Sequence, residues 1–123
     1  MGYNDPMSRP KKKPQPLVTP AIIRRVVKTI VREFQPEKII LFGSQARGKP
    51  RWDSDLDILI IGESDLRPVD RSVAVRMLFL DQGFPMDIIY YTPEQVNRWK
   101  EVRGSWIHYL VHEGKVIYAR KNH

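Results

Sequence analysis

Three short apolar runs constrain the fold of this chain more than any other feature. They span residues 38–42 (KIILF), 55–61 (DLDILII) and 86–91 (MDIIYY). Such runs are too short for buried helices, which typically need about ten residues or more, and they suit buried β-strands instead. The sequence therefore predicts a small sheet built from at least these three strands.

Amphipathic helices are predicted around the first two runs. Residues 19–34 place apolar side chains at steps of three and four, Thr19 can accept hydrogen bonds from free backbone N–H groups, and Pro20 suits the first helical position. Pro36 is expected to end this helix. A second helix is predicted over residues 69–80. Its expected buried side consists of Val69, Val73, Met77 and Leu80.

Helix-start signals return in the last third of the chain. Thr92 can cap a helix, and Gln95 can complete a capping box with it. This helix is expected to end near Gly104, a further helix is predicted over residues 105–112, and residues 116–118 are expected to form a small edge strand. Strands that alternate with helices indicate an α/β or α+β fold rather than a helical bundle or a β-sandwich.

Length, cysteine content and the lack of long apolar segments exclude several classes of protein. A chain of 123 residues has room for one domain with a modest core. The absence of cysteine excludes disulfide scaffolds, thiol catalysis and thiolate metal sites. No segment approaches the ~20 apolar residues of a membrane span, and no apolar signal-peptide core begins the chain. We therefore expect a soluble, cytoplasmic protein without membrane contact.

The excess of basic over acidic residues favours polyanionic partners. The chain has 21 Lys and Arg against 14 Asp and Glu, a formal net charge of +7, which favours nucleic acid, nucleotides or an acidic protein. Residues 1–16 include a run of three lysines and several prolines, and we expect them to form a disordered tail before a folded domain over residues 17–123. This tail either solubilises the protein or acts as a basic arm toward a partner.

The segment that follows the first apolar run carries the chemistry. Gly43 allows a backbone to approach a bulky ligand, and the Ser44 hydroxyl can donate to phosphate oxygens. Asp55 and Asp57 stand two positions apart on a predicted strand and so share one face. Two such carboxylates repel each other unless a cation lies between them. Sites with only oxygen ligands select Mg²⁺ or Mn²⁺. Substrate phosphates and water then complete the coordination of the ion.

A third carboxylate is available on the next strand. Asp87 lies near the start of the run 86–91. If this strand pairs beside the strand of Asp57, its side chain can reach the same cluster. It could then accept a proton from an attacking hydroxyl or complete a second metal site.

These residues resemble a known family. Gly43 and Ser44, ten intervening residues, the acids Asp55 and Asp57, and then Asp87 resemble the motif of the polymerase-beta-type nucleotidyltransferase superfamily. The strings GSQARG and SDLDILI resemble its minimal nucleotidyltransferase branch, whose small prokaryotic members are often paired with a HEPN-domain protein as antitoxin and toxin. The resemblance extends over residues 19–120, and it implies a small mixed sheet flanked by helices.

The resemblance also implies roles for individual residues. Gly43 and Ser44 match the turn that holds the nucleotide triphosphate, Asp55 and Asp57 match the metal-binding pair, and Asp87 matches the third carboxylate, which serves both metal binding and catalysis.

Two further positions are implied beside this turn and these acids. Arg47 matches a position that contacts phosphate or its own loop, and Ser54 matches the serine that orients the first carboxylate. Arg47, Lys49 and Arg51 together either form a solvated basic loop or contact the triphosphate or the acceptor.

The activity implied by the resemblance is transfer of AMP from ATP to a hydroxyl, assisted by two Mg²⁺ ions. The implied acceptor is a tyrosine of a cognate HEPN toxin, which would make the chain an antitoxin. One alternative is transfer to a small molecule, as in aminoglycoside nucleotidyltransferases, and another is an antitoxin that acts by binding alone. Few residues follow Glu101, so we expect a partner or a second subunit to build the acceptor pocket, and we do not expect nucleic acid as a substrate.

Two C-terminal features are expected to be structural. His108 and His112 have a spacing that can hold zinc, but Tyr109 stands where a metalloprotease motif needs glutamate. We therefore expect a packed or surface pair of histidines. Trp99, Trp106 and Tyr109 are expected in the core or at an interface rather than in a base-stacking platform.

Overall fold

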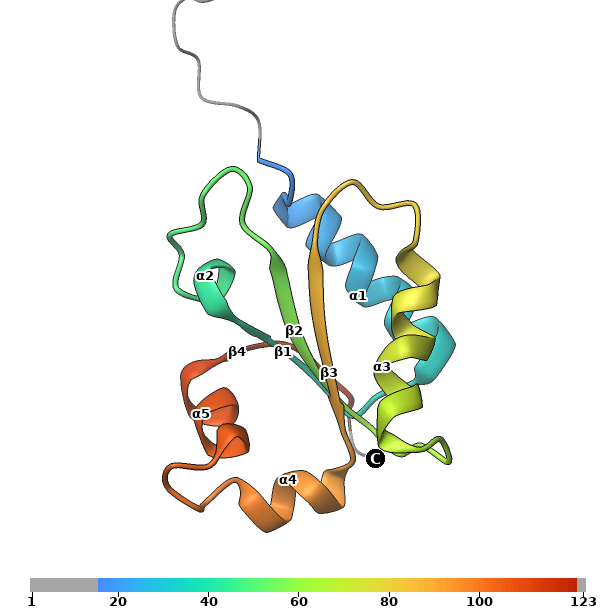
Figure 1. The fold of residues 1–123 in the computed structure, drawn as a ribbon, viewed down its shortest axis with the longest axis vertical. Coiled ribbons are helices and arrows are strands. Elements are labelled where there is room, and N and C mark those ends of the chain that lie inside the picture. Colours follow the sequence, from blue (N-terminus) through green and yellow to red (C-terminus); the bar gives the residue numbers. More distant parts are fainter. Residues whose placement is uncertain (1–15, 122–123) are drawn as a thin grey trace, which may run out of the picture.

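The computed structural model describes residues 16–121. One mixed sheet of four strands forms its centre, in the order β3-β2-β1-β4 (Figure 1). The tail predicted over residues 1–16 lies outside the described residues except for its last position. The strands are β1 (Lys38–Phe42), β2 (Leu56–Ile61), β3 (Met86–Tyr91) and β4 (Lys115–Ala119). The helices are α1 (Pro20–Phe34), α2 (Gly43–Ala46), α3 (Pro68–Arg76), α4 (Pro93–Trp99) and α5 (Trp106–Glu113).

Strand direction determines which loops meet at one edge of the sheet. β1 runs antiparallel to β2 and to β4, whereas β2 and β3 are parallel. The C-terminal end of β1 therefore lies beside the N-terminal ends of β2 and β3. The turn after Phe42 and the residues that enter β2 and β3 consequently share one edge of the sheet.

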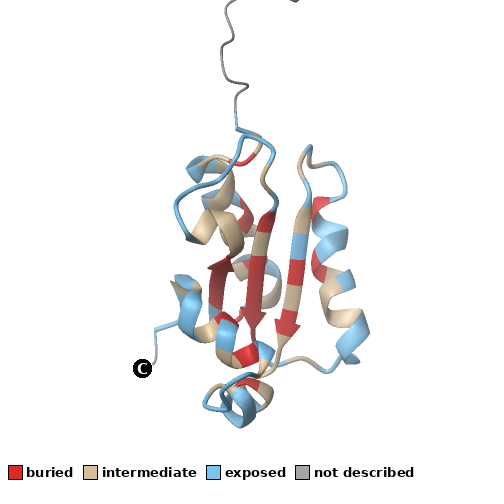
Figure 2. Cartoon of the chain, turned by 60° about the vertical axis from the view of Figure 1, so that its left-hand side comes forward, coloured by how far each residue is buried: buried red, intermediate tan, exposed pale blue. Residues whose placement is uncertain are grey.

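Helices cover both faces of the sheet. α1 and α3 pack on one face, and α4 and α5 pack on the other (Figure 1). Successive strand residues alternate between these faces, so Ile58 and Ile60 join the core under α1 and α3, while Leu59 and Ile61 join the core under α4 and α5. β1 and β2 are buried along most of their length, β3 is buried at Ile88 and Tyr90, and the outer surfaces of the helices are exposed (Figure 2).

The predicted strands are confirmed, including β4 at the edge beside β1. β2 begins at Leu56, so Asp55 precedes the strand rather than belonging to it. The helix-start signals are confirmed as well: the Ile22 N–H donates to the Thr19 side chain at 3.2 Å. Within residues 16–121, no helix combines the length and the apolar character needed to cross a membrane.

The helix expected from Thr92 to near Gly104 is shorter than predicted. α4 ends at Trp99, and the Ser105 hydroxyl donates to the Trp99 carbonyl at 3.0 Å. Gly104 has a φ of +87°, which glycine adopts without steric cost. The chain therefore turns between residues 100 and 105 and starts α5 in a new direction.

The predicted buried side of the helix over residues 69–80 is wrong. Val75 and Phe79 are its buried apolar residues, and α3 gives way after Arg76 to a 3-10 turn, Met77–Phe79. Apolar residues lie on more than one side of this segment, so their spacing alone does not select the side that meets the sheet. The residues expected inside are exposed: Val69, Val73, Met77 and Leu80.

The segment after β1 begins with a short helix. Residues 43–46 form the one-turn helix α2. The Arg47 N–H donates to the Gly43 carbonyl at 3.2 Å and closes this turn. Backbone hydrogen bonding therefore fixes the conformation of residues 43–46.

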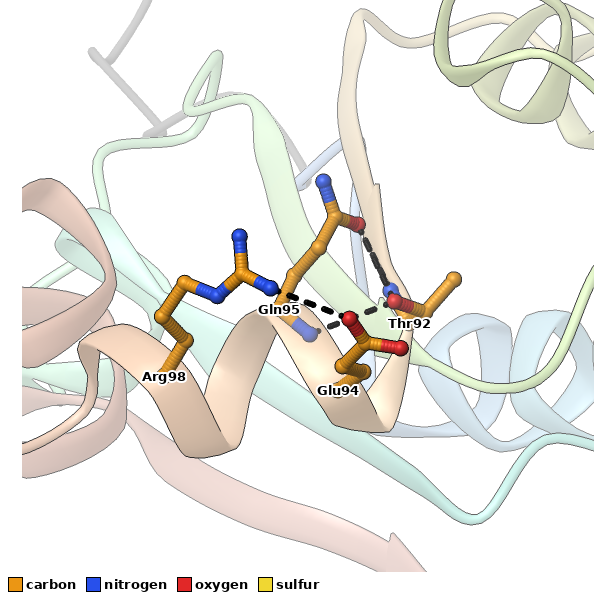
Figure 3. Close-up of polar contacts among 4 residues, drawn as sticks. All are labelled: Thr92, Glu94, Gln95 and Arg98. Atoms are coloured by element: carbon orange, nitrogen blue, oxygen red, sulfur yellow. Dashed lines mark hydrogen bonds and ion pairs between the residues drawn. The ribbon is translucent and has the colours of Figure 1, made fainter.

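The start of α4 contains the predicted capping box. The Gln95 N–H donates to the Thr92 hydroxyl at 3.3 Å, and the Thr92 N–H donates to Gln95 Oε1 at 2.9 Å (Figure 3). The same helix carries an exposed ion pair between Glu94 and Arg98 at 3.1 Å (Figure 3). A satisfied N-cap typically contributes about 1 kcal/mol, whereas an exposed ion pair contributes little.

We expect Thr92→Ala to lower the free energy of unfolding by about 1 kcal/mol, because the Gln95 N–H loses its acceptor, the Thr92 hydroxyl. Glu94→Ala is the matched control on the same turn and is expected to change it by less than about 0.5 kcal/mol. Urea unfolding followed by circular dichroism measures both. An equal effect of the two substitutions would contradict the assignment of the cap.

Candidate active site

Three side chains form a row across the sheet at the edge where α2 begins. Phe42 of β1 lies opposite Asp57 of β2, and Asp57 lies opposite Asp87 of β3. Directly paired residues of neighbouring strands project on the same face of a sheet. Since Leu59 follows Asp57 by two positions and packs under α5, the row faces the side of the sheet that α4 and α5 cover.

Asp57 is the electrostatic centre of this row. Its partial burial, and then the charges of Asp55 and Asp87, raise the pKa of Asp57 from 3.8 to about 6, although the charge of Arg47 acts in the opposite direction. The structure thus brings Asp55 and Asp87 within electrostatic reach of Asp57. Asp55 and Asp87 are exposed, whereas Asp57 is partly buried.

Gly43 lies directly against the Asp57 carboxylate. Its φ is +73°, a left-handed conformation that residues with a Cβ rarely adopt. A Cβ at this position would overlap the Asp57 carboxylate oxygen Oδ2. Close approach of the chain to the carboxylate therefore requires glycine here, and Ser44 follows in the same turn, partly buried.

The two remaining predicted site residues occupy different places. Arg47 ends α2, is exposed, and lies close enough to Asp57 to lower its pKa. The Ser54 hydroxyl accepts a hydrogen bond from the Arg51 N–H at 2.7 Å. This hydrogen bond shapes the loop that leads to Asp55, so the contact shown for Ser54 is with its own loop.

A cavity of about 830 Å³ opens beside the row. Phe42, Gly43, Asp57 and Asp87 line one side of it. The opposite side comes from the segment around α5, which sequence reasoning did not assign to the site: Gly104, Ser105, Trp106, His108, Tyr109, His112 and Glu113.

Long-range pairing explains why the α5 side of the cavity was missed. α5 reaches this position because β4, which follows it, pairs with β1. The spacing of residues along the chain carries no signal for such a pairing. Trp99, Trp106 and Tyr109 are exposed rather than part of the core, and the His108 and His112 rings lie 4.2 Å apart at the cavity wall.

The oxygen atoms of the three carboxylates suit a hard divalent cation. Asp55, Asp57 and Asp87 offer only oxygen, and their mutual repulsion raises the affinity of Asp57 for a positive charge. Across residues 16–121, no three acidic or histidine side chains are preassembled around one ion position. Substrate phosphates and water would therefore complete the ligand set, as is usual for Mg²⁺.

Two known proteins are similar to this chain. Over 82 residues the chain is 38% identical to a Methanocaldococcus jannaschii protein named "Putative protein adenylyltransferase MJ0604", an alignment that covers 67% of this chain and 78% of that protein. A crystal structure described as that of a "putative nucleotidyltransferase" from Sulfolobus solfataricus superposes with a TM-score of 0.55 at 23% identity, covering 80% of this chain and 78% of the other. The latter likeness supports the fold alone.

The family described as "Nucleotidyltransferase domain" matches residues 23–112, which include most of α1, the Gly43 turn and the three carboxylates. This match spans most of the chain. The protein therefore belongs to the nucleotidyltransferase domain family and is a nucleotidyltransferase enzyme.

Proposed function

We propose that this enzyme is an Mg²⁺-dependent protein adenylyltransferase, which moves AMP from ATP to a tyrosine hydroxyl of a HEPN-domain toxin and thereby acts as its antitoxin. The observation that carries the proposal is the contact between the Gly43 turn and the Asp57 carboxylate. This contact places a turn suited to phosphate beside carboxylates suited to a metal ion, which is what a metal–triphosphate substrate requires.

Each residue of the site has a defined task in this reaction. The backbone and hydroxyl at Gly43 and Ser44 bind the triphosphate, and Arg47 adds positive charge beside it. Two Mg²⁺ ions, bound by Asp55 and Asp57 with help from Asp87, would neutralise charge on the triphosphate as the transfer proceeds.

The transfer forms one bond at the α-phosphorus and breaks another. The acceptor oxygen forms a bond to the α-phosphorus, the bond between that phosphorus and the oxygen bridging to the β-phosphate breaks, and pyrophosphate leaves. Asp87 accepts the proton of the acceptor hydroxyl. Positioning of the two reactants and electrostatic stabilisation of the charge that develops on the phosphates together supply the rate enhancement expected for such a displacement.

The position of Asp87 supports a large acceptor. Asp87 is exposed and lies on β3, which is an edge strand of the sheet. A side chain that protrudes from another protein can approach it from outside, without a dedicated acceptor domain. The name of the Methanocaldococcus jannaschii relative, a protein adenylyltransferase, favours the same class of acceptor.

Transfer is tested with ATP labelled at the α-phosphate, Mg²⁺ and a HEPN-domain protein of the same source. We expect label to appear on the HEPN protein with the wild type and to fall at least a hundredfold with Asp55→Asn/Asp57→Asn, because the metal–triphosphate complex loses its protein ligands. Asp65→Asn, which changes an exposed aspartate at the other end of the sheet, is the control and should label normally.

Three outcomes separate the proposal from its alternatives. Label on no protein, or equal label from the wild type and the double variant, would refute protein adenylylation. Label on an aminoglycoside, when one is added in place of the HEPN protein, would favour a small-molecule acceptor. Suppression of toxicity by the double variant would indicate an antitoxin that acts by binding alone.

Two glycines offer a matched test of the turn. Gly43 and Gly48 both have a φ of +73°, but only at Gly43 would a Cβ meet another group within 4 Å. We expect Gly43→Ala and Gly48→Ala each to lower stability by about 1 kcal/mol. Only Gly43→Ala should also lower transfer, by about a hundredfold, because it displaces Asp57. Equal transfer rates of the two variants would contradict the role of the Gly43 contact.

The raised pKa of Asp57 predicts that its charge destabilises the metal-free fold. Its folded pKa of about 6 exceeds its ordinary value of 3.8, so its favourable contribution is complete below about pH 4 and is lost as pH rises through 6. Asp57→Asn should therefore raise the melting temperature in EDTA at pH 8 by several degrees, corresponding to about 1 kcal/mol after solvent screening. At pH 4 the difference should be small.

Scanning calorimetry from pH 4 to pH 8 measures this difference, with Asp65→Asn as the control. A difference between wild type and Asp57→Asn that stays constant over this range would contradict the electrostatic account of the row.

A further inference from the structure

Trp106 and Tyr109 form an exposed pair of parallel rings at the wall of the active-site cavity. Both belong to α5, and their rings stack with centroids 5.4 Å apart and planes 11° apart. Trp106 is 49% exposed and Tyr109 is 42% exposed. Both line the same cavity as Asp57 and Asp87. Large aromatic surface left open at the wall of a ligand cavity is suited to a further flat ring.

Phe42 fixes this pair relative to the Gly43 turn. The ring of buried Phe42 meets the Trp106 ring at 86°, with centroids 6.1 Å apart. Phe42 also pairs with Asp57 across the sheet and directly precedes Gly43. One buried side chain therefore connects the exposed rings to the turn and to the carboxylates, so the distance between them is held by the packed core.

The lining of the cavity indicates which part of a nucleotide would occupy it. Gly43 and Asp57 line the cavity, but Ser44 and Arg47 do not. A triphosphate bound over Ser44 and toward Arg47 therefore leaves the cavity for the nucleoside, which extends from the α-phosphate in the direction of α5. The ribose and base then lie between the carboxylates and the aromatic pair.

We propose that the Trp106–Tyr109 pair binds the nucleobase of the nucleoside triphosphate by stacking. This subsite rests on the proposed function, since it assumes that the triphosphate lies at the Gly43 turn. It also revises the expectation that these two residues serve the core or an interface. Stacking of a base on an aromatic side chain is strong and tolerant of base identity, so the pair holds the nucleoside in place while the acceptor oxygen attacks the α-phosphorus.

The experiment compares a whole nucleotide with its phosphate portion alone. Isothermal titration calorimetry with Mg²⁺ measures binding of an ATP analogue that has a non-cleavable α,β-methylene link, and binding of inorganic tripolyphosphate. We expect Trp106→Leu to weaken binding of the analogue about tenfold and to leave binding of tripolyphosphate unchanged. Trp106→Phe should retain most of the affinity, because a flat ring is restored.

Trp99→Leu is the matched control. Trp99 is 45% exposed, similar to Trp106, but does not line the cavity. This variant should bind both probes like the wild type. Tyr109→Leu provides a second test of the pair and should also weaken the analogue selectively. Circular dichroism of each variant establishes that it is folded.

Three results would overturn the nucleobase subsite. They are wild-type affinity of Trp106→Leu and Tyr109→Leu for the analogue, an equal loss of affinity for tripolyphosphate, and a rise in the KM for the acceptor without a change in nucleotide binding. Failure of the proposed function is a different result: the wild type transfers no AMP, yet binds the analogue in a manner that depends on Trp106.

Discussion

The pairing register of β1, β2 and β3 is the constraint on which the rest of the site depends. It places Phe42, Asp57 and Asp87 in one row and brings the turn at Gly43 against the Asp57 carboxylate. A shift of one residue in β2 would turn Asp57 toward the core under α1 and α3, where its charge would lie among apolar side chains, and would exchange the residues that pack on the two faces. The hydrophobic cores on the two sides of the sheet therefore fix the positions of the acids.

Stability and function act against each other at this row. Burial and two neighbouring acids raise the pKa of Asp57, so the metal-free fold carries repulsion that a bound cation would relieve. The rest of the described chain avoids such conflicts: it has no buried charged or polar side chain and no buried polar side-chain atom without a hydrogen-bond partner. Strain concentrated at one place in an otherwise satisfied fold is typical of a functional site.

Sequence patterns predicted the strands, the helix caps at Thr19 and Thr92, and the grouping of Gly43 with the acids, because each depends on local spacing or on a short motif. They did not predict the buried side of α3, where apolar residues on several sides compete. Nor did they predict that α5 lines the cavity, since this depends on the pairing of β4 with β1. The metal, the nucleotide and the acceptor remain proposals that the placement of these residues supports.

The most direct test of the central claim is a crystal structure with Mn²⁺ and a non-cleavable ATP analogue, since anomalous scattering locates Mn²⁺ without assumptions about its ligands. The account predicts a manganese peak between Asp55 and Asp57, with triphosphate oxygens completing its coordination and the β- and γ-phosphates over Gly43 and Ser44. Manganese bound elsewhere, or a triphosphate bound away from the Gly43 turn, would contradict it.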